Sequence, residues 1–150
     1  MNKSGWTRLL IPLCMVTLTA CPGPGDRMNF DETAQIRVVG DKVCFLVGNA
    51  LDYQPADMGI NRRGTLAKEK HFVFNPDLKV MDGELCIPPS FYRFPQTGQF
   101  LIEYILVSKK SPPRKVVVAL EIVAGRINRV PPNDREISRP YSQLHGESTR

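Results

Sequence analysis

The chain has 150 residues, of which 42% are hydrophobic, 23% charged and 8% aromatic, which is enough for one compact domain and too little for two domains with separate cores. Thirteen Pro and eleven Gly, scattered without a repeat, favour strands joined by turns over a helical bundle. The formal net charge is +5; without Lys3 and Arg8 near the N-terminus, 18 basic residues face 15 acidic ones and leave +3, a balance too mild for a nucleic-acid-binding protein.

The N-terminus has the pattern of a secretory signal peptide. Two basic residues precede an apolar run over residues 9–18. At a rise of about 1.5 Å per residue, this run is too short to cross a hydrocarbon core of about 30 Å. Ala20 directly precedes Cys21, with Leu18 two residues further back, and this arrangement resembles the lipobox of bacterial lipoproteins. The resemblance implies that residues 1–20 are removed and that Cys21 receives diacylglycerol.

The alternative is an ordinary secreted protein in which Cys21 is incidental. A lipidated cysteine with two or three acyl chains would hold the protein stably on a membrane, because each buried methylene contributes about 0.8 kcal/mol. Pro22 follows the cysteine, and no Asp stands there as an inner-membrane retention signal. We therefore expect a lipid anchor on the periplasmic face of the cell envelope, with the outer membrane favoured over the inner.

Residues 21–33 begin with Pro-Gly-Pro-Gly after the cysteine and are predicted to form a flexible tether. With Cys14 in the signal peptide and Cys21 lipidated, Cys44 and Cys86 remain in the folded part. Two cysteines in an oxidising compartment suggest one disulfide. The alternatives are two buried free thiols or a metal pair, but the two His of the chain offer no obvious further zinc ligands.

Residues 34–125 have the pattern of an all-β domain, with short β-branched and aromatic runs separated by turn residues. The first two runs, joined by Gly40-Asp41, predict a hairpin. Seven strands are expected, around residues 35–38, 43–47, 58–61, 71–74, 85–87, 100–106 and 116–122. This number and spacing predict an immunoglobulin-like β-sandwich, with a small β-barrel as the alternative.

The last two expected strands are apolar on both faces and are predicted to be central and covered on both sides. Their second face carries Leu101, Ile105, Val107, Val117, Ala119 and Val123. Cys44 falls on the second strand and Cys86 on the fifth, which can be neighbours in one sheet, so a cross-strand bridge is geometrically plausible. Residues 126–150 are polar, with few apolar residues to bury, and are expected to form a disordered tail.

The sequence holds no recognisable catalytic constellation. His71 lies in a strand-like run and His145 in the polar tail, and neither has a nucleophile elbow or a zinc-binding His-Glu-x-x-His partner. Phosphate-binding loops and dinucleotide fingerprints are also missing from the sequence. We therefore expect a protein that is not an enzyme, with no catalytic residue, no metal and no cofactor.

Two basic segments are candidates for binding a partner. Arg62 and Arg63 occupy one predicted turn, and four further cations flank Pro112 and Pro113, namely Lys109, Lys110, Arg114 and Lys115. One interpretation is that these are solvated turns that keep the sheet soluble. The other is a basic rim that meets an acidic partner, since the planar guanidinium of Arg pairs with a carboxylate at two points.

Four segments together resemble a known family. They are Leu18-Thr19-Ala20-Cys21-Pro22-Gly23-Pro24-Gly25-Asp26-Arg27, Val43-Cys44-Phe45, Asp52-Tyr53-Gln54-Pro55 and Ile60-Asn61-Arg62-Arg63-Gly64-Thr65. The family is one of small enterobacterial lipoproteins described as type VI secretion immunity periplasmic lipoproteins. The resemblance implies a protein that protects its own cell by binding a cognate toxic effector, with membrane-degrading lipases as one effector class. It implies no catalytic residue.

A second function from another class stays open, that of a structural or assembly lipoprotein of the envelope or of a secretion apparatus. The two functions predict different deletion phenotypes. A cell lacking an immunity protein dies only when siblings attack it, whereas a cell lacking an assembly protein loses secretion or envelope integrity while growing alone. In both cases we expect contact with the membrane through the lipid and no contact with nucleic acid.

Overall fold

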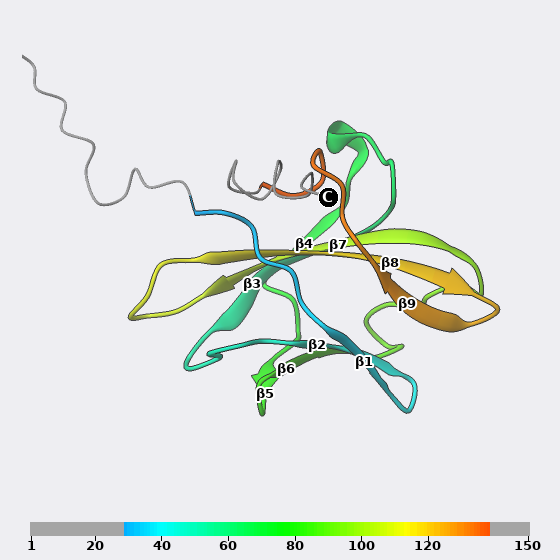
Figure 1. Cartoon of the computed structure of the whole chain (residues 1–150). Helices are drawn as coiled ribbons and strands as arrows, with labels where there is room; N and C mark the ends of the chain where they lie inside the picture. Colours follow the sequence, from blue (N-terminus) through cyan, green and yellow to red (C-terminus); the bar gives the residue numbers. More distant parts are fainter. Residues whose placement is uncertain (1–28, 139–150) are drawn as a thin grey trace, which may run out of the picture.

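The fold is a two-layer β-sandwich, seen in a computed structural model that describes residues 29–138 (Figure 1). One antiparallel sheet has the order β1-β2-β6-β5, and the other has the order β4-β3-β7-β8-β9. The bounds of the elements are β1 Ile36–Val39, β2 Lys42–Leu46, β3 Gln54–Arg62, a 3-10 turn Ala67–Glu69, β4 Phe72–Phe74, β5 Val80–Met81, β6 Glu84–Ile87, β7 Gly98–Val107, β8 Arg114–Val123 and β9 Arg126–Val130.

The strand order is that of an immunoglobulin-like sandwich. In such domains the first, second, fifth and fourth strands form one sheet, and the remaining strands form the other. Here β1, β2, β6 and β5 take the first set of places, β3, β7 and β8 take the second, and β4 extends the edge next to β3. The predicted all-β class and sandwich are confirmed. The alternative of a closed barrel is wrong, because no ladder joins the two sheets within residues 29–138.

The strands form where the alternation of apolar residues predicted them. All seven expected strands are present, and the hairpin turn at Gly40-Asp41 joins β1 to β2 with Val39 opposite Lys42. Gly40 has a φ of 62°, a conformation that glycine adopts without steric cost. Two further strands, β5 and β9, complete the nine within the described range. The two residues of β5 are too few to give a periodic signal.

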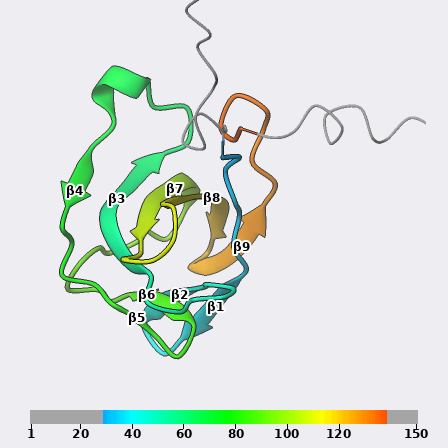
Figure 2. The same cartoon turned by 90° about the vertical axis from the view of Figure 1, so that its left-hand side faces the viewer.

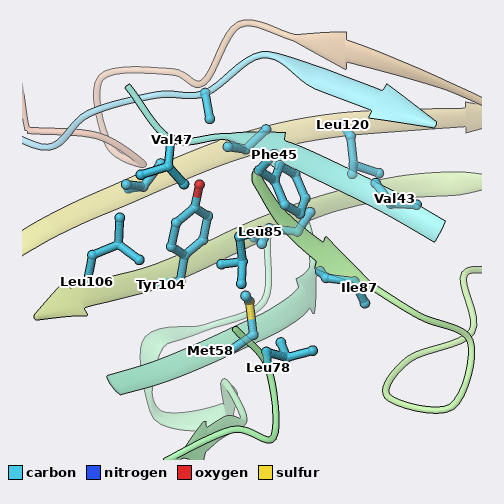
Figure 3. Close-up of a cluster of buried hydrophobic side chains, with 14 of the residues drawn as sticks. Val43, Phe45, Val47, Met58, Leu78, Leu85, Ile87, Tyr104, Leu106 and Leu120 are labelled. Atoms are coloured by element: carbon cyan, nitrogen blue, oxygen red, sulfur yellow. The ribbon is translucent and has the colours of Figure 1, made fainter. Parts of the chain in front are cut away.

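The core lies between the facing sides of the two sheets (Figure 3). From the four-stranded sheet, Val43, Phe45, Leu85 and Ile87 point inward, and each is at most 4% exposed. The five-stranded sheet contributes one face of β3, β7 and β8, comprising Met58, Phe100, Ile102, Tyr104, Leu106, Val116, Val118, Leu120 and Ile122. The face of β7 and β8 predicted to carry Leu101, Val117 and Ala119 is therefore the one that points away from this core.

The outer face of the five-stranded sheet is covered only at its middle. Leu101, Val117 and Ala119 are buried there together with Ile137, which comes from the C-terminal segment. Val107 and Val123, at the ends of β7 and β8, are 40% and 54% exposed. The prediction that β7 and β8 are covered on both sides is thus correct for their centres and wrong for their ends.

Both predicted domain boundaries need correction. Residues 126–138 are not a disordered tail, because β9 pairs with β8 from Ala119↔Val130 to Val123↔Arg126 and Ile137 is 7% exposed. At the N-terminal end, Glu32 forms a parallel bridge with Val116, so the folded part begins before residue 34. Both segments are held by β8. Its backbone pairs with β9 and with Glu32, and its apolar outer face covers Ile137.

Signal residues 1–20, Cys21 and the first part of the expected tether lie outside the described residues, as does the predicted tail from 139 to 150.

Viewed from the side, β1 of one sheet lies near β9 of the other, whereas β4 stands apart at the opposite edge (Figure 2). A search of the described part found no helix that is long and apolar enough to span a membrane.

Candidate protein-binding site

Arg114, one of the six predicted partner-binding residues, is used inside the fold. Its guanidinium donates two hydrogen bonds to the Glu32 carboxylate, at 2.8 and 2.5 Å, and one to the carbonyl of Gly48 at 2.8 Å. It also lies 5.0 Å from the centre of the Tyr53 ring. The bond to Glu32 raises the pKa of Arg114. Arg114 therefore fastens the N-terminal segment to β8 and has little capacity left for a partner.

Arg63 plays the same part for the C-terminal segment. Its guanidinium donates to both oxygens of Glu136, at 2.7 and 2.8 Å, and to the carbonyl of Pro131 at 3.1 Å. The hydrogen bond from Arg63 is the main cause that lowers the pKa of Glu136. This pair holds the segment that follows β9 against the sheet.

The other four predicted residues have less internal bonding. Arg62 stacks 5.4 Å from the centre of the Phe100 ring, and the ammonium of Lys115 lies 3.4 Å from Asp31 and 4.0 Å from Glu103. Lys109 and Lys110 are exposed in a turn held by the Asp52 carboxylate, which accepts bonds from Ser108 and from the amide of Lys109. The hydrogen bond from the Ser108 hydroxyl is the main cause that lowers the pKa of Asp52.

The two predicted basic segments do not form one patch. Arg62 is opposite Phe100, near the start of β7, whereas Lys109 follows the end of β7 at Val107. At about 3.3 Å per residue, these positions are about 30 Å apart along the sheet. A single basic rim built from the six predicted residues is therefore wrong, because antiparallel pairing places the two turns at opposite ends of the same sheet.

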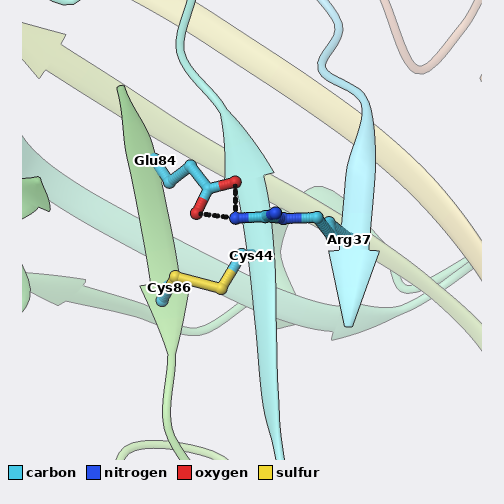
Figure 4. The surroundings of a disulfide bond; sticks show 4 residues. All are labelled: Arg37, Cys44, Glu84 and Cys86. Atoms are coloured by element: carbon cyan, nitrogen blue, oxygen red, sulfur yellow. Dashed lines mark hydrogen bonds and ion pairs between the residues drawn. A yellow bond between two sulfur atoms is a disulfide. The ribbon is translucent and has the colours of Figure 1, made fainter. Parts of the chain in front are cut away.

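Cys44 and Cys86 form a disulfide on the outer face of the four-stranded sheet. The two residues are directly opposite each other on β2 and β6, and their side chains point away from the core formed by Val43 and Phe45 (Figure 4). Next to them, Arg37 lies opposite Cys44 on β1 and donates to the Glu84 carboxylate at 2.7 Å. The result is a row of covalent and ionic links across three adjacent strands.

A hollow of about 380 Å³ lies over this row. Its floor includes the disulfide, and its apolar walls include Met81 and Val39, which are 67% and 45% exposed. Such an exposed apolar surface on a rigid sheet is typical of a site that binds another molecule.

The rim of the hollow is charged. It carries Arg37, Lys42 and Lys79 against Asp77 and Glu84. Arg37 and Glu84 neutralise each other. Lys42 and Lys79 are exposed and have no salt bridge within residues 29–138. Their long side chains are free to meet carboxylates of a partner around the apolar floor.

The sequence prediction missed Lys42 and Lys79 as candidates. The alternation of side chains along the first hairpin could have indicated Arg37, which is on the same face of that hairpin as Cys44. No sequence signal places Lys79 there, because it comes from the connection between β4 and β5, which crosses from one sheet to the other.

The possible metal ligands of the hollow are already used by other bonds. Among the described residues, the one group of three possible metal ligands is Cys44, Glu84 and Cys86. The two sulfurs are bonded to each other, and the carboxylate is held by Arg37. A metal would need free thiolates, so the disulfide form of this site does not fit one.

The comparison with protein families matches residues 31–125 to a domain of unknown function, DUF7480. The chain belongs to this family. The matched range includes the disulfide and the whole hollow, and it ends before β9 begins at Arg126. Neither the curated proteins nor the solved structures include a significant match to the chain.

Proposed function

We propose that this DUF7480 protein is a lipid-anchored binding protein of the periplasm that neutralises a type VI secretion effector by direct contact. The observation that supports this proposal best is the hollow over the Cys44–Cys86 disulfide, with its apolar floor and its two unpaired lysines. The lipobox at Ala20-Cys21 and the resemblance of the mature N-terminus to immunity lipoproteins support the compartment and the class of partner.

An inhibitor of this kind works by binding alone. The effector would place an apolar residue on the floor of the hollow and acidic residues against Lys42 and Lys79. Burial of the apolar contact would supply most of the affinity, and the charge pairs on the rim would supply orientation and a fast encounter. The disulfide between β2 and β6 limits movement of the floor, so less conformational entropy is lost on binding.

The proposed lipid at Cys21 has a physical role in the same mechanism. An inhibitor confined to the membrane surface is present there at a high effective concentration without any additional contact. From Cys21 to Asn29, the first described residue, the chain spans at most about 30 Å at 3.3 to 3.6 Å per residue. The domain would stay close to the surface on which a membrane-directed effector acts.

The first experiment tests protection. The gene for this protein is deleted, and the mutant is grown alone and in contact with parental siblings. We expect normal growth alone and killing by siblings, with rescue by the full chain. Loss of envelope integrity or of secretion during growth alone would instead support an assembly lipoprotein.

The second experiment tests the surface. The effector that kills the deletion mutant is titrated with the wild-type protein and with the double variant Lys42→Glu plus Lys79→Glu. We expect this variant to lose at least tenfold in affinity, because each reversed charge repels the acidic residues of the effector.

The matched control is Lys109→Glu plus Lys110→Glu, which reverses the same number of charges at the turn between β7 and β8. We expect the control to bind the effector as the wild type does. If the control loses affinity and the rim variant does not, the contact surface is the basic turn predicted from the sequence and not the hollow.

A further inference from the structure

The strand β4 forms an open edge of the five-stranded sheet, at the end of the order that begins β4-β3. Its three residues, Phe72, Val73 and Phe74, are 39%, 50% and 75% exposed. Large apolar side chains on an unpaired edge strand favour pairing with another strand. This edge belongs to a different sheet from the hollow over the disulfide.

The register of β4 shows which of its backbone groups are free. The amide of Asn75 donates to the carbonyl of Ala56, directly opposite it on β3. In an antiparallel ladder, hydrogen-bonded pairs alternate with pairs that are not hydrogen-bonded, so Val73 bonds with Met58. The amides and carbonyls of Phe72 and Phe74 therefore point away from β3, toward the open edge.

Two other edge strands within the described range, β5 and β9, are protected. At β5, the Gln54 side chain bonds both the amide and the carbonyl of Val80, at 2.9 and 3.3 Å. β9 has the sequence Arg-Ile-Asn-Arg-Val, with two arginines on an edge strand, and charged residues of this kind discourage edge pairing.

β4 itself contains neither a charged residue nor a proline. The nearest cation before it, Lys70, has its ammonium 2.6 Å from the Glu103 carboxylate, so this charge is not free to protect the edge. Unlike β5 and β9, β4 thus has no protecting side chain.

A groove of about 310 Å³ follows the same edge on the outer face of the sheet. Phe72 and Phe74 line one side of it, with Ile105 on β7. The Phe72 ring lies over Gly59, where a Cβ atom would come within 2.6 Å of the ring. Glycine at this position therefore lets the ring pack directly against β3.

We propose that β4 pairs with β4 of a second copy of this chain, antiparallel and about a two-fold axis at Val73. The strand is self-complementary in this register. Phe72 of one copy is opposite Phe74 of the other, and their outward amides and carbonyls form four hydrogen bonds between the copies. The phenyl rings of both copies then meet in one row over the outer face, and the two Val73 side chains meet on the other face.

The size of this contact sets its strength. A three-residue strand with two Phe and one Val per copy buries less than the roughly 1,200 to 2,000 Å² of a standard interface. We therefore expect a dimer that dissociates on dilution. Confinement of both copies to a membrane surface would raise its population, but pairing does not depend on the lipid.

Cysteine cross-linking of the full chain in its own cells tests the pairing. In the variant Val73→Cys, the two new thiols are opposite each other in a pair that is not hydrogen-bonded, the arrangement in which strands come closest. A mild oxidant should convert most of this variant to a species of twice the chain mass on a non-reducing gel.

The matched control is Val123→Cys, which is 54% exposed on β8, a strand with neighbours on both sides. It should give at least fivefold less cross-linked species than Val73→Cys. Equal cross-linking of the two variants would overturn the proposal.

A second pair of variants, made in the Val73→Cys background, separates strand pairing from simple apolar contact. Phe74→Ala removes the phenyl ring and keeps the outward backbone N–H. Phe74→Pro removes both the phenyl ring and this N–H, and it leaves the hydrogen bonds between β4 and β3 intact. We expect cross-linking to fall further, by several fold, in Phe74→Pro than in Phe74→Ala. Equal yields in the two would overturn pairing through the backbone.

The unsubstituted chain provides an independent measurement that no misfolded variant can affect. Its native mass is followed by sedimentation in detergent at rising protein concentration. We expect the mass to approach twice that of the monomer at high concentration, and a mass that stays at one chain throughout would refute the dimer.

Discussion

The hydroxyl of Tyr104 lies in the sandwich core, 1% exposed, and it is the one buried side-chain polar atom in the described part of the chain that has no hydrogen-bond partner. Burial raises the pKa of this phenol far above its ordinary value. An unsatisfied buried hydroxyl costs about 1 to 3 kcal/mol. We expect Tyr104→Phe to leave the free energy of unfolding unchanged or to raise it by about 1 kcal/mol, as measured by urea titration; a loss above about 1 kcal/mol would mean that the hydroxyl has a partner.

The pair formed by Arg63 and Glu136 makes stability depend on pH. The pKa of Glu136 is lowered in the folded protein from its ordinary value of 4.5. The stabilisation is therefore fully present above that value and is lost as the pH falls through the lowered pKa. We expect Glu136→Gln to be about 1 to 2 kcal/mol less stable at pH 7 and to lose less stability than the wild type between pH 6 and pH 3.

Thermal unfolding at several pH values measures this effect. The control is Glu69→Gln, an exposed carboxylate in the 3-10 turn, which should follow the wild-type curve. If Glu136→Gln and the wild type lose stability in parallel on acidification, the ion pair does not contribute to the acid sensitivity of the fold.

At the scale of elements, the disulfide links two strands that are already hydrogen-bonded neighbours. It closes a loop with a sequence separation of 42 residues, for which loop entropy predicts about 4 kcal/mol of stabilisation. We expect the double variant Cys44→Ala plus Cys86→Ala to be destabilised by about that amount.

Chemical denaturation of both proteins under oxidising conditions provides the measurement. The wild type under reducing conditions should approach the variant. A loss below about 1 kcal/mol would show that pairing of β2 with β6 is held mainly by the core residues Phe45 and Leu85.

At this scale, the first and last described segments are also part of the fold. Glu32 pairs with Arg114 on β8, Glu136 pairs with Arg63, and the amide of Asp31 donates to the carbonyl of Ser138 at 3.1 Å. The segment that leads to the proposed lipid is thereby joined directly to the segment that follows β9. A pull on the anchor would reach β8 through Asp31 and Glu32.

For the whole molecule, the central expectation is a lipid at Cys21. Mass spectrometry of the protein from membranes should give a chain that begins at Cys21 and is heavier by a diacylglycerol and an acyl group. The variant Cys21→Ser should lose membrane attachment. An unmodified chain in the cytosol, with both remaining thiols reduced, would contradict the anchor and the disulfide together.

The proposed surfaces fit together on the whole molecule. The hollow is on the outer face of the four-stranded sheet, and β4 is at the edge of the five-stranded sheet. A dimer through β4 would present two hollows to effectors. This arrangement would also leave the turn with Lys109 and Lys110 free, at the end of β7.

The sequence by itself determined the all-β class, the position of seven strands and which residues of β7 and β8 share a face. These features depend on local alternation, since residues two apart share a face of a strand wherever the strand lies. The same local pattern predicted β4 as a strand but carried no information about its place at an open edge.

Only the tertiary structure decided how distant residues are used. Arg114 meets Glu32 across 82 positions, and Arg63 meets Glu136 across 73. β9 and Ile137 become ordered because β8 offers them an edge and an apolar face, and Lys42 and Lys79 meet at one hollow because a connection crosses between the sheets. Such pairings follow from strand order and register, which depend on packing of the whole chain and not on any short run of residues.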